Sequence, residues 1–358
     1  MIPFTDLQSQ YQEAKQEIDA GIKQIIDTNS YITGPAVEEF EQKLIDYTGA
    51  QSSASCGSGT TALLISLRAC GIGVGDEVIT TAHTFVATTE AICDVGATPV
   101  FVDIDEYYHL NIDQIEDAIT EHTKAILFVD LYGQTPNINK LKKIATKYNL
   151  KLIEDAAQSF GSDYLNNKVG SLVDITACSF NPVKNLGAMG DSGCVTGSKE
   201  LVDIARMYRD HGRQEKFTYE FVGYNARIDN MQAKIIQAKL PYLDSWLDKK
   251  RKICRHYTNE LKDYYVTPKE TTWSTHSYYV YVLQHEKRNE IMNQLKHKGI
   301  ATNIHYPKPN NIQPAFKDYA CDLPVTESVC KKIFSIPCYH SLTDHSIEYI
   351  IKTLKEVA

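Results

Sequence analysis

Short apolar segments alternate with segments of helical periodicity along the first half of the chain. The pattern predicts strands over residues 77–80, 99–102, 125–129, 151–154 and 175–180. Helices are predicted between them, over residues 60–70, 85–95, 112–119 and 138–148. Strands that alternate with helices form a mainly parallel central sheet flanked by helices on both faces. The predicted fold is therefore α/β, with a ligand site at the carboxyl ends of the strands.

The second half of the chain has a different pattern. A long helical tract over 228–261 is followed by a strand over 277–283 and by helices over 289–298 and 347–357. This α+β order predicts a large domain over residues 1–245, with a helical N-terminal segment, and a smaller C-terminal domain over 246–358. The chain length of 358 residues agrees with two domains, because a domain averages ~150 residues.

Composition and charge narrow the class of protein. Lys and Arg total 37 against 45 Asp and Glu, and this net charge of −8 gives no basic surface for DNA or RNA. No apolar run approaches the ~18 residues that a membrane helix needs. The nine cysteines are scattered, without C-x-x-C spacing or a secretory segment before them, so we expect reduced thiols in the cytoplasm.

Glycines precede the first predicted helix in the segment Gly57-Ser-Gly59-Thr60-Thr61-Ala62. The segment fits the dinucleotide fingerprint G-x-G-x-x-A, but that fingerprint follows an apolar strand, whereas residues 50–56 are small and polar. Backbone N–H groups at a helix start favour an anion. We therefore interpret the segment as a phosphate-binding turn, with a plain helix-entry turn as the alternative.

Two charged residues follow strands on the same predicted sheet edge. Asp155 ends the strand over 151–154, where a buried carboxylate needs a partner; it could equally cap the following turn. Lys184 lies between a strand end and an apolar, glycine-containing turn that could lower its pKa; it could equally be a solvated surface residue. A carboxylate for a ring nitrogen, an amine for an aldehyde and an anion site together are what pyridoxal phosphate requires.

The order of motifs along the chain is specific. The segments are Tyr31-Ile-Thr-Gly-Pro35, Gly57-Ser-Gly-Thr60, Gly75-Asp-Glu-Val78, His83-Thr-Phe-Val-Ala-Thr88, Leu131-Tyr-Gly-Gln134, Glu154-Asp-Ala-Ala-Gln158, Lys184-Asn-Leu-Gly187, Gly223-Tyr-Asn-Ala-Arg227 and His305-Tyr-Pro307. They cover nearly the whole chain. With them the sequence resembles the fold-type-I pyridoxal-phosphate aminotransferases of the nucleotide-sugar (DegT/StrS-type) family. Ser192, where many relatives carry Gly or Ala, is a mild departure.

The resemblance implies a role for each matched residue. Lys184 would bond covalently to the cofactor aldehyde and then carry the proton between the donor carbon and the cofactor. Asp155 would pair with the ring nitrogen, Gln158 with the ring hydroxyl oxygen, and Phe85 would stack on the ring. The phosphate would be held by Gly59, Thr60 and Ser179, and by Asn225 from the other subunit of a homodimer. The sugar-nucleotide pocket would be lined by Tyr31, Arg227, His305 and Tyr306.

The resemblance also suggests a substrate. Gln158 stands where relatives that act at C4 of the sugar tend to have His, and with the opening Pro3-Phe-Thr-Asp-Leu7 it resembles the branch that aminates C3. The implied reaction passes an amino group from L-glutamate, in two half-reactions through the pyridoxal and pyridoxamine forms of the cofactor, to a nucleotide-linked 3-keto-6-deoxyhexose carried by dTDP. A C4-keto sugar and a UDP-linked 3-keto uronic acid are the alternative acceptors.

Three other functions stay open at this point. Dehydratases of the same family lack the lysine, a non-catalytic cofactor or sugar sensor would not need it, and an NAD-dependent oxidoreductase would leave Lys184 unexplained. Some residues also have plain structural interpretations. Phe85 could be ordinary core, His211-Gly-Arg213 would order a loop, and His340 and His345 would lie on the surface, without the spacing of a metal site.

Overall fold

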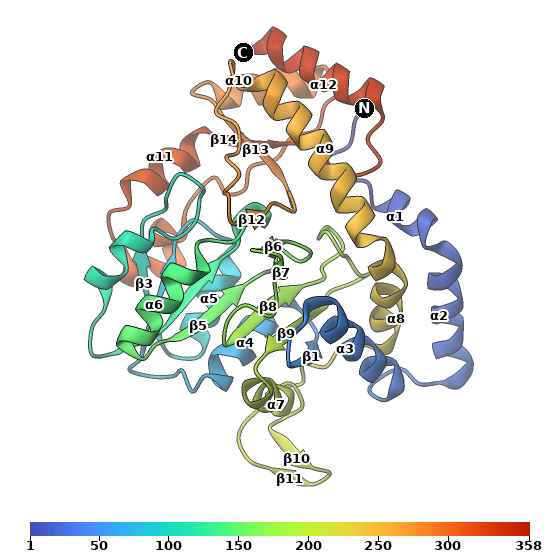
Figure 1. The fold of residues 1–358 in the computed structure, drawn as a ribbon, viewed down its shortest axis with the longest axis vertical. Helices are drawn as coiled ribbons and strands as arrows, with labels where there is room; N and C mark the ends of the chain where they lie inside the picture. Colours follow the sequence, from blue (N-terminus) through green and yellow to red (C-terminus); the bar gives the residue numbers. More distant parts are fainter.

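The computed structural model describes all 358 residues and is built on a seven-stranded sheet in the order β1-β9-β8-β5-β4-β2-β3 (Figure 1). Strand β9 is antiparallel to both of its neighbours, and every other pair is parallel. The strands are β1 (Ser52–Cys56), β2 (Glu77–Thr81), β3 (Thr98–Val102), β4 (Thr123–Val129), β5 (Lys151–Asp155), β8 (Ile175–Ser179) and β9 (Gly193–Gly197). The five predicted strands are confirmed, each to within two residues.

Helices cover both faces of this sheet. One face packs on α4 (Gly59–Ala69), α5 (Val86–Asp94) and α7 (Lys199–Tyr208). The other packs on α3 (Pro35–Thr48), α6 (Ile138–Tyr148) and α8 (Asn230–Lys239). Alternate residues of each strand enter alternate cores: Leu127 faces α4 and α5, whereas Phe128 faces α3 and α6. The α/β fold class is confirmed.

Two predicted helical elements differ in the structure, the strand predicted over 277–283 is shorter (β13, Tyr281–Gln284), and strand β1 was not predicted. Residues 112–119 form two short 3-10 turns, η1 (Ile112–Gln114) and η2 (Glu116–Ala118), and not one helix. The tract over 228–261 is divided into α8 and α9 (Leu243–Leu261) by the turn η4 (Leu240–Tyr242), because Pro241 cannot donate a helical hydrogen bond. Strand β1 lies in the small and polar segment 50–56; all five of its residues are buried.

A separate group of elements follows α9. The strands β13 (Tyr281–Gln284) and β14 (Ile333–Ile336) pair antiparallel, and α10 (Arg288–His297), α11 (Pro324–Lys332) and α12 (Asp344–Val357) accompany them. With α9, the strands β13 and β14 and the helices α10 and α12 enclose a third hydrophobic core, whereas Val329 of α11 packs against the core of the large sheet. We propose on this basis that residues 246–358 form the smaller unit, with the boundary in the first turn of α9.

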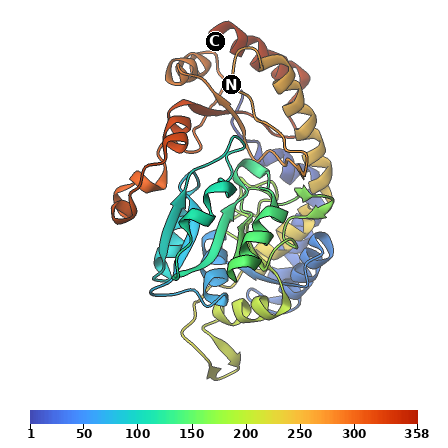
Figure 2. The same ribbon diagram turned by 60° about the vertical axis from the view of Figure 1, so that its left-hand side comes forward.

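The remaining elements lie around the sheet. The N-terminal helices α1 (Leu7–Glu13) and α2 (Lys15–Thr28) run beside α8 and α9, and the hairpin β10 (Arg213–Glu215)–β11 (Thr218–Tyr219) projects away from the body (Figures 1 and 2). The short strands β6 (Asp163–Tyr164), β7 (Asn167–Lys168) and β12 (Ser274–Thr275) form a three-stranded sheet, and η3 (Leu131–Gly133), η5 (Asn310–Ile312) and η6 (Pro314–Tyr319) are single turns. No helix is both long and apolar enough to span a bilayer.

Candidate active site

A cavity of about 430 Å³ opens at the carboxyl ends of β1, β2, β4, β5 and β8. This is the sheet edge where the sequence predicted a ligand site. Nine of the twelve predicted site residues line it: Gly59, Thr60, Phe85, Asp155, Gln158, Ser179, Lys184, His305 and Tyr306. Gly59 and His305, which are 246 residues apart in the sequence, thus line the same cavity, because the strand ends and the segment before η5 converge there.

The turn after β1 forms an anion site. Ser58 caps α4, its Oγ accepting a hydrogen bond from the Thr61 N–H at 3.0 Å, while the N–H groups of Gly59 and Thr60 have no acceptor in the chain. A Cβ on Gly59 would lie 2.6 Å from the Ser179 Cβ, so only glycine lets these two backbones approach. Free N–H groups at a helix start, with the Ser179 hydroxyl beside them, suit a phosphate.

Asp155 is buried at the end of β5 and has two hydrogen-bond donors. Its Oδ2 accepts from the Thr88 hydroxyl at 2.8 Å, and its Oδ1 accepts from the Ala157 N–H at 3.2 Å. The Ala157 contact is the turn-capping role that the sequence allowed. Burial raises the pKa of Asp155, and the bonds from Thr88 and Ala157 and the charge of Lys184 oppose that rise. The carboxylate is therefore held in place and faces a cation.

Lys184 reaches into the same cavity and is not a solvated surface residue. Its Nζ lies 4.3 Å from the ring centroid of Tyr279. Burial lowers the pKa of Lys184 to about 8, with the Asp155 charge acting in the opposite direction. A lysine with this pKa has a substantial neutral fraction near pH 7.5, and a neutral amine is what attacks a carbonyl.

Gln158 has its amide orientation fixed from both ends. Its Oε1 accepts from the Tyr132 N–H at 2.7 Å, and its Nε2 donates to the Tyr306 hydroxyl at 3.1 Å. An amide nitrogen has two hydrogens, so one donor remains available on Nε2. Gln158 is thus set to donate to an acceptor oxygen in the cavity.

Aromatic side chains form the rest of the wall. Phe85 is 52% exposed, with its ring centroid 5.8 Å from that of Tyr306, so it is a cavity residue and not ordinary core. Burial lowers the pKa of His305 to about 4, and its Nδ1 lies 2.9 Å from the Ser335 hydroxyl, so the ring is a neutral hydrogen-bonding group. Tyr279, Thr88 and Asn181 were not predicted; Tyr279 and Thr88 contact residues far along the chain, which leaves no local pattern in the sequence.

Three predicted residues lie outside this cavity. Tyr31 is half exposed in the loop before α3. Arg227 donates to Asp210 at 3.0 Å and to the Asn225 side chain at 2.7 Å, so the two predicted residues hold each other. Within one chain none of the three lines the cavity.

One predicted surface residue is buried. His340 stacks on Trp246 at a ring-centroid distance of 5.1 Å, and its Nε2 lies 3.0 Å from a Glu13 carboxylate oxygen. The prediction was wrong because α1 and α9 cover this ring. His345 is exposed, as expected.

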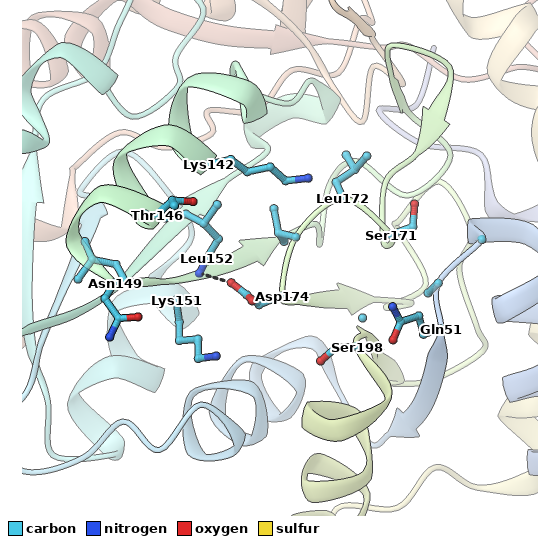
Figure 3. Close-up of a pocket in the computed structure, with 16 residues that line it drawn as sticks. Gln51, Lys142, Thr146, Asn149, Lys151, Leu152, Ser171, Leu172, Asp174 and Ser198 are labelled. Atoms are coloured by element: carbon cyan, nitrogen blue, oxygen red, sulfur yellow. Dashed lines mark hydrogen bonds between the residues drawn. The ribbon is translucent and has the colours of Figure 1, made fainter.

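A second cavity of about 680 Å³ lies at the opposite edge of the sheet, near the amino ends of β5 and β8 (Figure 3). Lys142, Lys151 and Ser198 line it, and Asp174 accepts from the Leu152 N–H at 2.9 Å. It contains no predicted site residue. Of these two cavities, the larger is therefore not the one that carries the chemistry; a third, of about 840 Å³, is lined by Arg227 but by no other predicted site residue.

Comparison with known proteins settles the family. Residues 12–355 match the DegT/DnrJ/EryC1/StrS aminotransferase family. The chain belongs to this family. The match covers nearly the full length, as the resemblance predicted, and an oxidoreductase built on Gly57–Ala62 is thereby ruled out.

Three relatives align over almost their whole length with this aminotransferase. A pleiotropic regulatory protein of Geobacillus stearothermophilus is 39% identical, with 99% of this chain and 98% of that protein covered. The UDP-2-acetamido-2-deoxy-3-oxo-D-glucuronate aminotransferase of Pseudomonas aeruginosa is also 39% identical, with 99% of each chain covered. The dTDP-3-amino-3,4,6-trideoxy-alpha-D-glucose transaminase of Streptomyces venezuelae is 36% identical, with 100% and 96% covered.

Two solved structures superpose closely on the aminotransferase. S. venezuelae DesV, in complex with a ketimine intermediate, gives a TM-score of 0.96 at 35% identity, with 99% of this chain and 98% of DesV covered. NtdA from Bacillus subtilis, with bound cofactor PMP, gives 0.93 at 31% identity, with 99% and 85% covered. The enzyme is a PLP-dependent sugar aminotransferase of the α/β class.

The residues of this chain fit that cofactor. The N–H groups of Gly59 and Thr60 lack acceptors, as a phosphate site requires, and the turn has no room for a Cβ at Gly59. A lysine of lowered pKa and a buried carboxylate lie in the same cavity. The amine for the aldehyde, the N–H groups for the phosphate and the carboxylate for the ring nitrogen are therefore all present.

Proposed function

We propose that this aminotransferase passes an amino group from L-glutamate to the C3 keto group of a nucleotide-linked sugar, with a dTDP-linked 3-keto-6-deoxyhexose as the expected acceptor. The proposal rests on three groups that line one cavity. They are Lys184, whose pKa is lowered, the buried carboxylate of Asp155, and the N–H groups of Gly59 and Thr60, which have no acceptor in the chain. The free cysteines support a cytoplasmic location.

Each side chain has a task that follows from its position. The Gly59 turn and Ser179 would bind the cofactor phosphate, Asp155 the ring nitrogen, Gln158 the ring hydroxyl oxygen, and Phe85 the ring face. Pyridoxal phosphate supplies a carbonyl that accepts amino groups and a ring that takes up the electrons released at the reacting carbon. Asp155 can do its part only as an anion, and the hydrogen bond from Thr88 opposes the rise in its pKa that burial causes.

Lys184 would move the proton at the reacting carbon. With a pKa of about 8, its Nζ can take a proton and return it near neutral pH at comparable cost. The ring of Tyr279 lies beside Nζ and keeps it at the cavity wall when the amine is free. The neutral His305 and the Tyr306 hydroxyl can donate hydrogen bonds to the sugar without adding charge.

The regiochemistry is supported by Gln158 and by the relatives. Transaminases named for 3-amino and 3-oxo sugars are 36–39% identical to this chain. A 6-deoxy sugar is favoured over a uronic acid by the charge of the cavity. Lys184 is the one Lys or Arg in its wall, and Arg227 is already paired with Asp210. Even if Arg227 reaches the site from the other subunit of the dimer proposed below, a sugar carboxylate would have to displace Asp210 from it.

We also propose a homodimer with shared active sites. Asn225, Arg227 and Tyr31 lie outside the cavity of their own chain, as residues that serve a partner's site would. Phe217, Tyr219 and Val222 are exposed in and next to the projecting hairpin (Figure 2). Apolar side chains gathered on a projection are typical of an interface.

The experiment offers glutamate with dTDP-linked 3-keto and 4-keto 6-deoxyhexoses and a UDP-linked 3-keto uronic acid, in parallel. The proposal expects ping-pong turnover of the dTDP-3-keto sugar in preference to both others. Preference for the 4-keto sugar would overturn the regiochemistry, and preference for the uronic acid would overturn the sugar class. Sedimentation of the protein alone tests the dimer.

A non-catalytic regulator is the second candidate, because one relative at 39% identity is named a regulatory protein. The two functions differ in one measurement. A regulator would bind the cofactor without exchanging its amino group, whereas the enzyme converts glutamate to 2-oxoglutarate stoichiometrically with the loaded protein. If protein that has bound the cofactor forms no 2-oxoglutarate from glutamate, the regulator is favoured.

A further inference from the structure

The turn that carries Lys184 is held from the side away from the cavity by α8 and α9. Lys250 on α9 donates from Nζ to the Asn185 Oδ1 at 2.8 Å. Lys239, the last residue of α8, donates from Nζ to the Gly187 carbonyl at 2.7 Å. The Met189 N–H donates to the Gln232 Oε1 at 2.9 Å. Three consecutive alternate residues of the turn, 185, 187 and 189, are therefore anchored to two helices.

Two of these anchors are buried lysines. Lys239 is 3% and Lys250 is 8% exposed, and the amine of each donates to an uncharged oxygen, not to a carboxylate. Burial lowers the pKa of Lys239 to about 8 and also lowers that of Lys250. A buried amine without a counter-charge costs free energy. The two buried lysines differ from apolar side chains in one respect: their amines donate hydrogen bonds to the turn.

The turn has little freedom to adopt another shape around these anchors. A Cβ on Gly187 would lie 2.3 Å from the Pro182 carbonyl oxygen, so the chain folds back on itself at this point. Leu186 and Ala188 are buried in the core that α8 shares with the sheet. The side chains of 186 and 188 thus pack inward, while 185, 187 and 189 supply the polar contacts.

A small cavity of about 40 Å³ lies next to Lys184, Asn185 and Lys250. Two buried polar atoms at its wall have no hydrogen-bond partner, the Asn185 Nδ2 and the Gln10 Oε1 of α1. A space of this size accommodates one water molecule, which could bridge the donor and the acceptor. The N-terminal helix would then join the same network.

We propose that Lys239 and Lys250 are positioning residues, which fix the turn over 184–190 from behind so that the Lys184 amine stays aligned with Asp155. The inference rests on the proposed role of Lys184 as the reacting amine. It does not depend on the identity of the sugar.

The test compares Lys250→Met and Lys239→Met with Lys252→Met, a control at an exposed site on α9. The first readout is hydrogen exchange of the peptide 181–192 in the cofactor-free protein. Loss of a hydrogen bond to a charged group corresponds to about tenfold or more in an equilibrium constant. We expect exchange at least about tenfold faster in Lys250→Met and Lys239→Met, unchanged exchange in Lys252→Met, and partial rescue in Lys250→Arg.

The second readout separates positioning from stability. In Lys250→Met, Asn185 is left without its partner, so we pair it with Asn185→Leu in a double variant that makes the contact apolar. We expect this double variant to melt at or above the wild-type temperature, yet to keep fast exchange in 181–192 and a reduced kcat with an unchanged KM for glutamate. If Lys250→Met alone does not fold, exchange and kcat are measured on the double variant in its place.

Two results would overturn the proposal. One is slow, wild-type exchange in 181–192 in both methionine variants. The other is a double variant with both wild-type stability and wild-type kcat, since the lysines would then be structural only. The exchange readout needs neither cofactor nor sugar, so a failure of the proposed substrate leaves it intact.

Discussion

A cavity lies at each of two edges of the central sheet. Both cavities adjoin β5 and β8, but they differ in size and in the groups that line them. The cavity at the amino edge is the larger, about 680 against 430 Å³. Its charged residues are Lys142, Lys151 and Asp174, and Asp174 accepts a hydrogen bond from the Leu152 N–H of β5 (Figure 3). At the carboxyl edge, burial shifts the pKa of Asp155, Lys184 and His305 together.

The difference shows what identifies a site in this fold. Parallel strands direct the turns that follow them to one edge, and those turns supply free N–H groups and convergent side chains. Cavity size does not identify the site, because the smaller of the two cavities holds the converging groups. Shifted pKa values in one cavity report groups that are held in an unfavourable environment, which is a sign of function.

The largest effect is expected for the lysines of the two cavities. Lys184→Ala removes the amine that moves the proton, so transamination should fall by about 10³-fold or more. Lys142→Ala, in the other cavity, should leave kcat and KM unchanged. Steady-state turnover with glutamate measures both. Comparable losses in the two variants would abolish the distinction between the edges.

The carboxylates give the next contrast. Asp155→Asn keeps the shape and removes the charge, and loss of one such electrostatic group typically costs about 10²-fold in kcat. Asp174→Asn weakens the bond from the Leu152 N–H and should lower the free energy of unfolding by about 1–2 kcal/mol, with kcat unchanged. Kinetics and denaturant unfolding of both variants check this. A stability loss without a kcat loss in Asp155→Asn would contradict the assignment.

The ionisation of Lys184 sharpens the contrast with a pH profile. An amine-directed reagent should label Lys184 of the cofactor-free protein with a midpoint near pH 8, because burial lowers its pKa from 10.5 to about 8. Between these pH values the unfolded chain binds the proton and the folded chain does not, so stability contributed at this residue rises with pH. In Asp155→Asn the midpoint should move lower still, since the Asp155 charge favours the ammonium. A midpoint near 10.5 would count against a desolvated amine.

The smallest effect concerns the acids behind Asp155. Burial raises the pKa of Glu154 to about 7, and that of neighbouring Asp130 is raised by burial and by the Glu154 charge. The folded protein therefore holds a proton that the unfolded chain releases near pH 4.5, and stability falls as pH rises from about 4.5 to 7. Glu154→Gln should flatten this fall by on the order of 1 kcal/mol. Unfolding curves at pH 5 and 7.5 measure it, and an equal fall in stability for variant and wild type would show that Glu154 does not hold this proton.

Much of the fold could be predicted because its signals are local. The strands β2, β4 and β5 are apolar runs with turns after them, and Pro-free stretches such as α6 show clean helical spacing. Strand β1 escaped because Ser52, Ser53 and Ser55 look like a loop; their burial comes from pairing with β9, 139 or more residues away. Residues 112–119 have helical spacing but form only two short turns.

The candidate site could be predicted where a motif combines residue type with a strand end, as at Asp155, Lys184 and Gly59. Residues that act through distant contacts could not. Nothing near Thr88 shows that its hydroxyl reaches Asp155, and Lys239 and Lys250 look like ordinary charged positions on helices until the turn over 184–190 packs on them. His340 was misjudged for the same reason, because only the fold brings Trp246 and Glu13 over it.

The most direct test of the central claim is to incubate the protein with pyridoxal phosphate, reduce it with borohydride and map the modified peptide by mass spectrometry. The account predicts one labelled lysine, Lys184, and no label in Lys184→Ala, while Lys142→Ala is labelled like the wild type. Label on Lys142 or Lys151, or a folded wild-type protein that takes up no label, would contradict it.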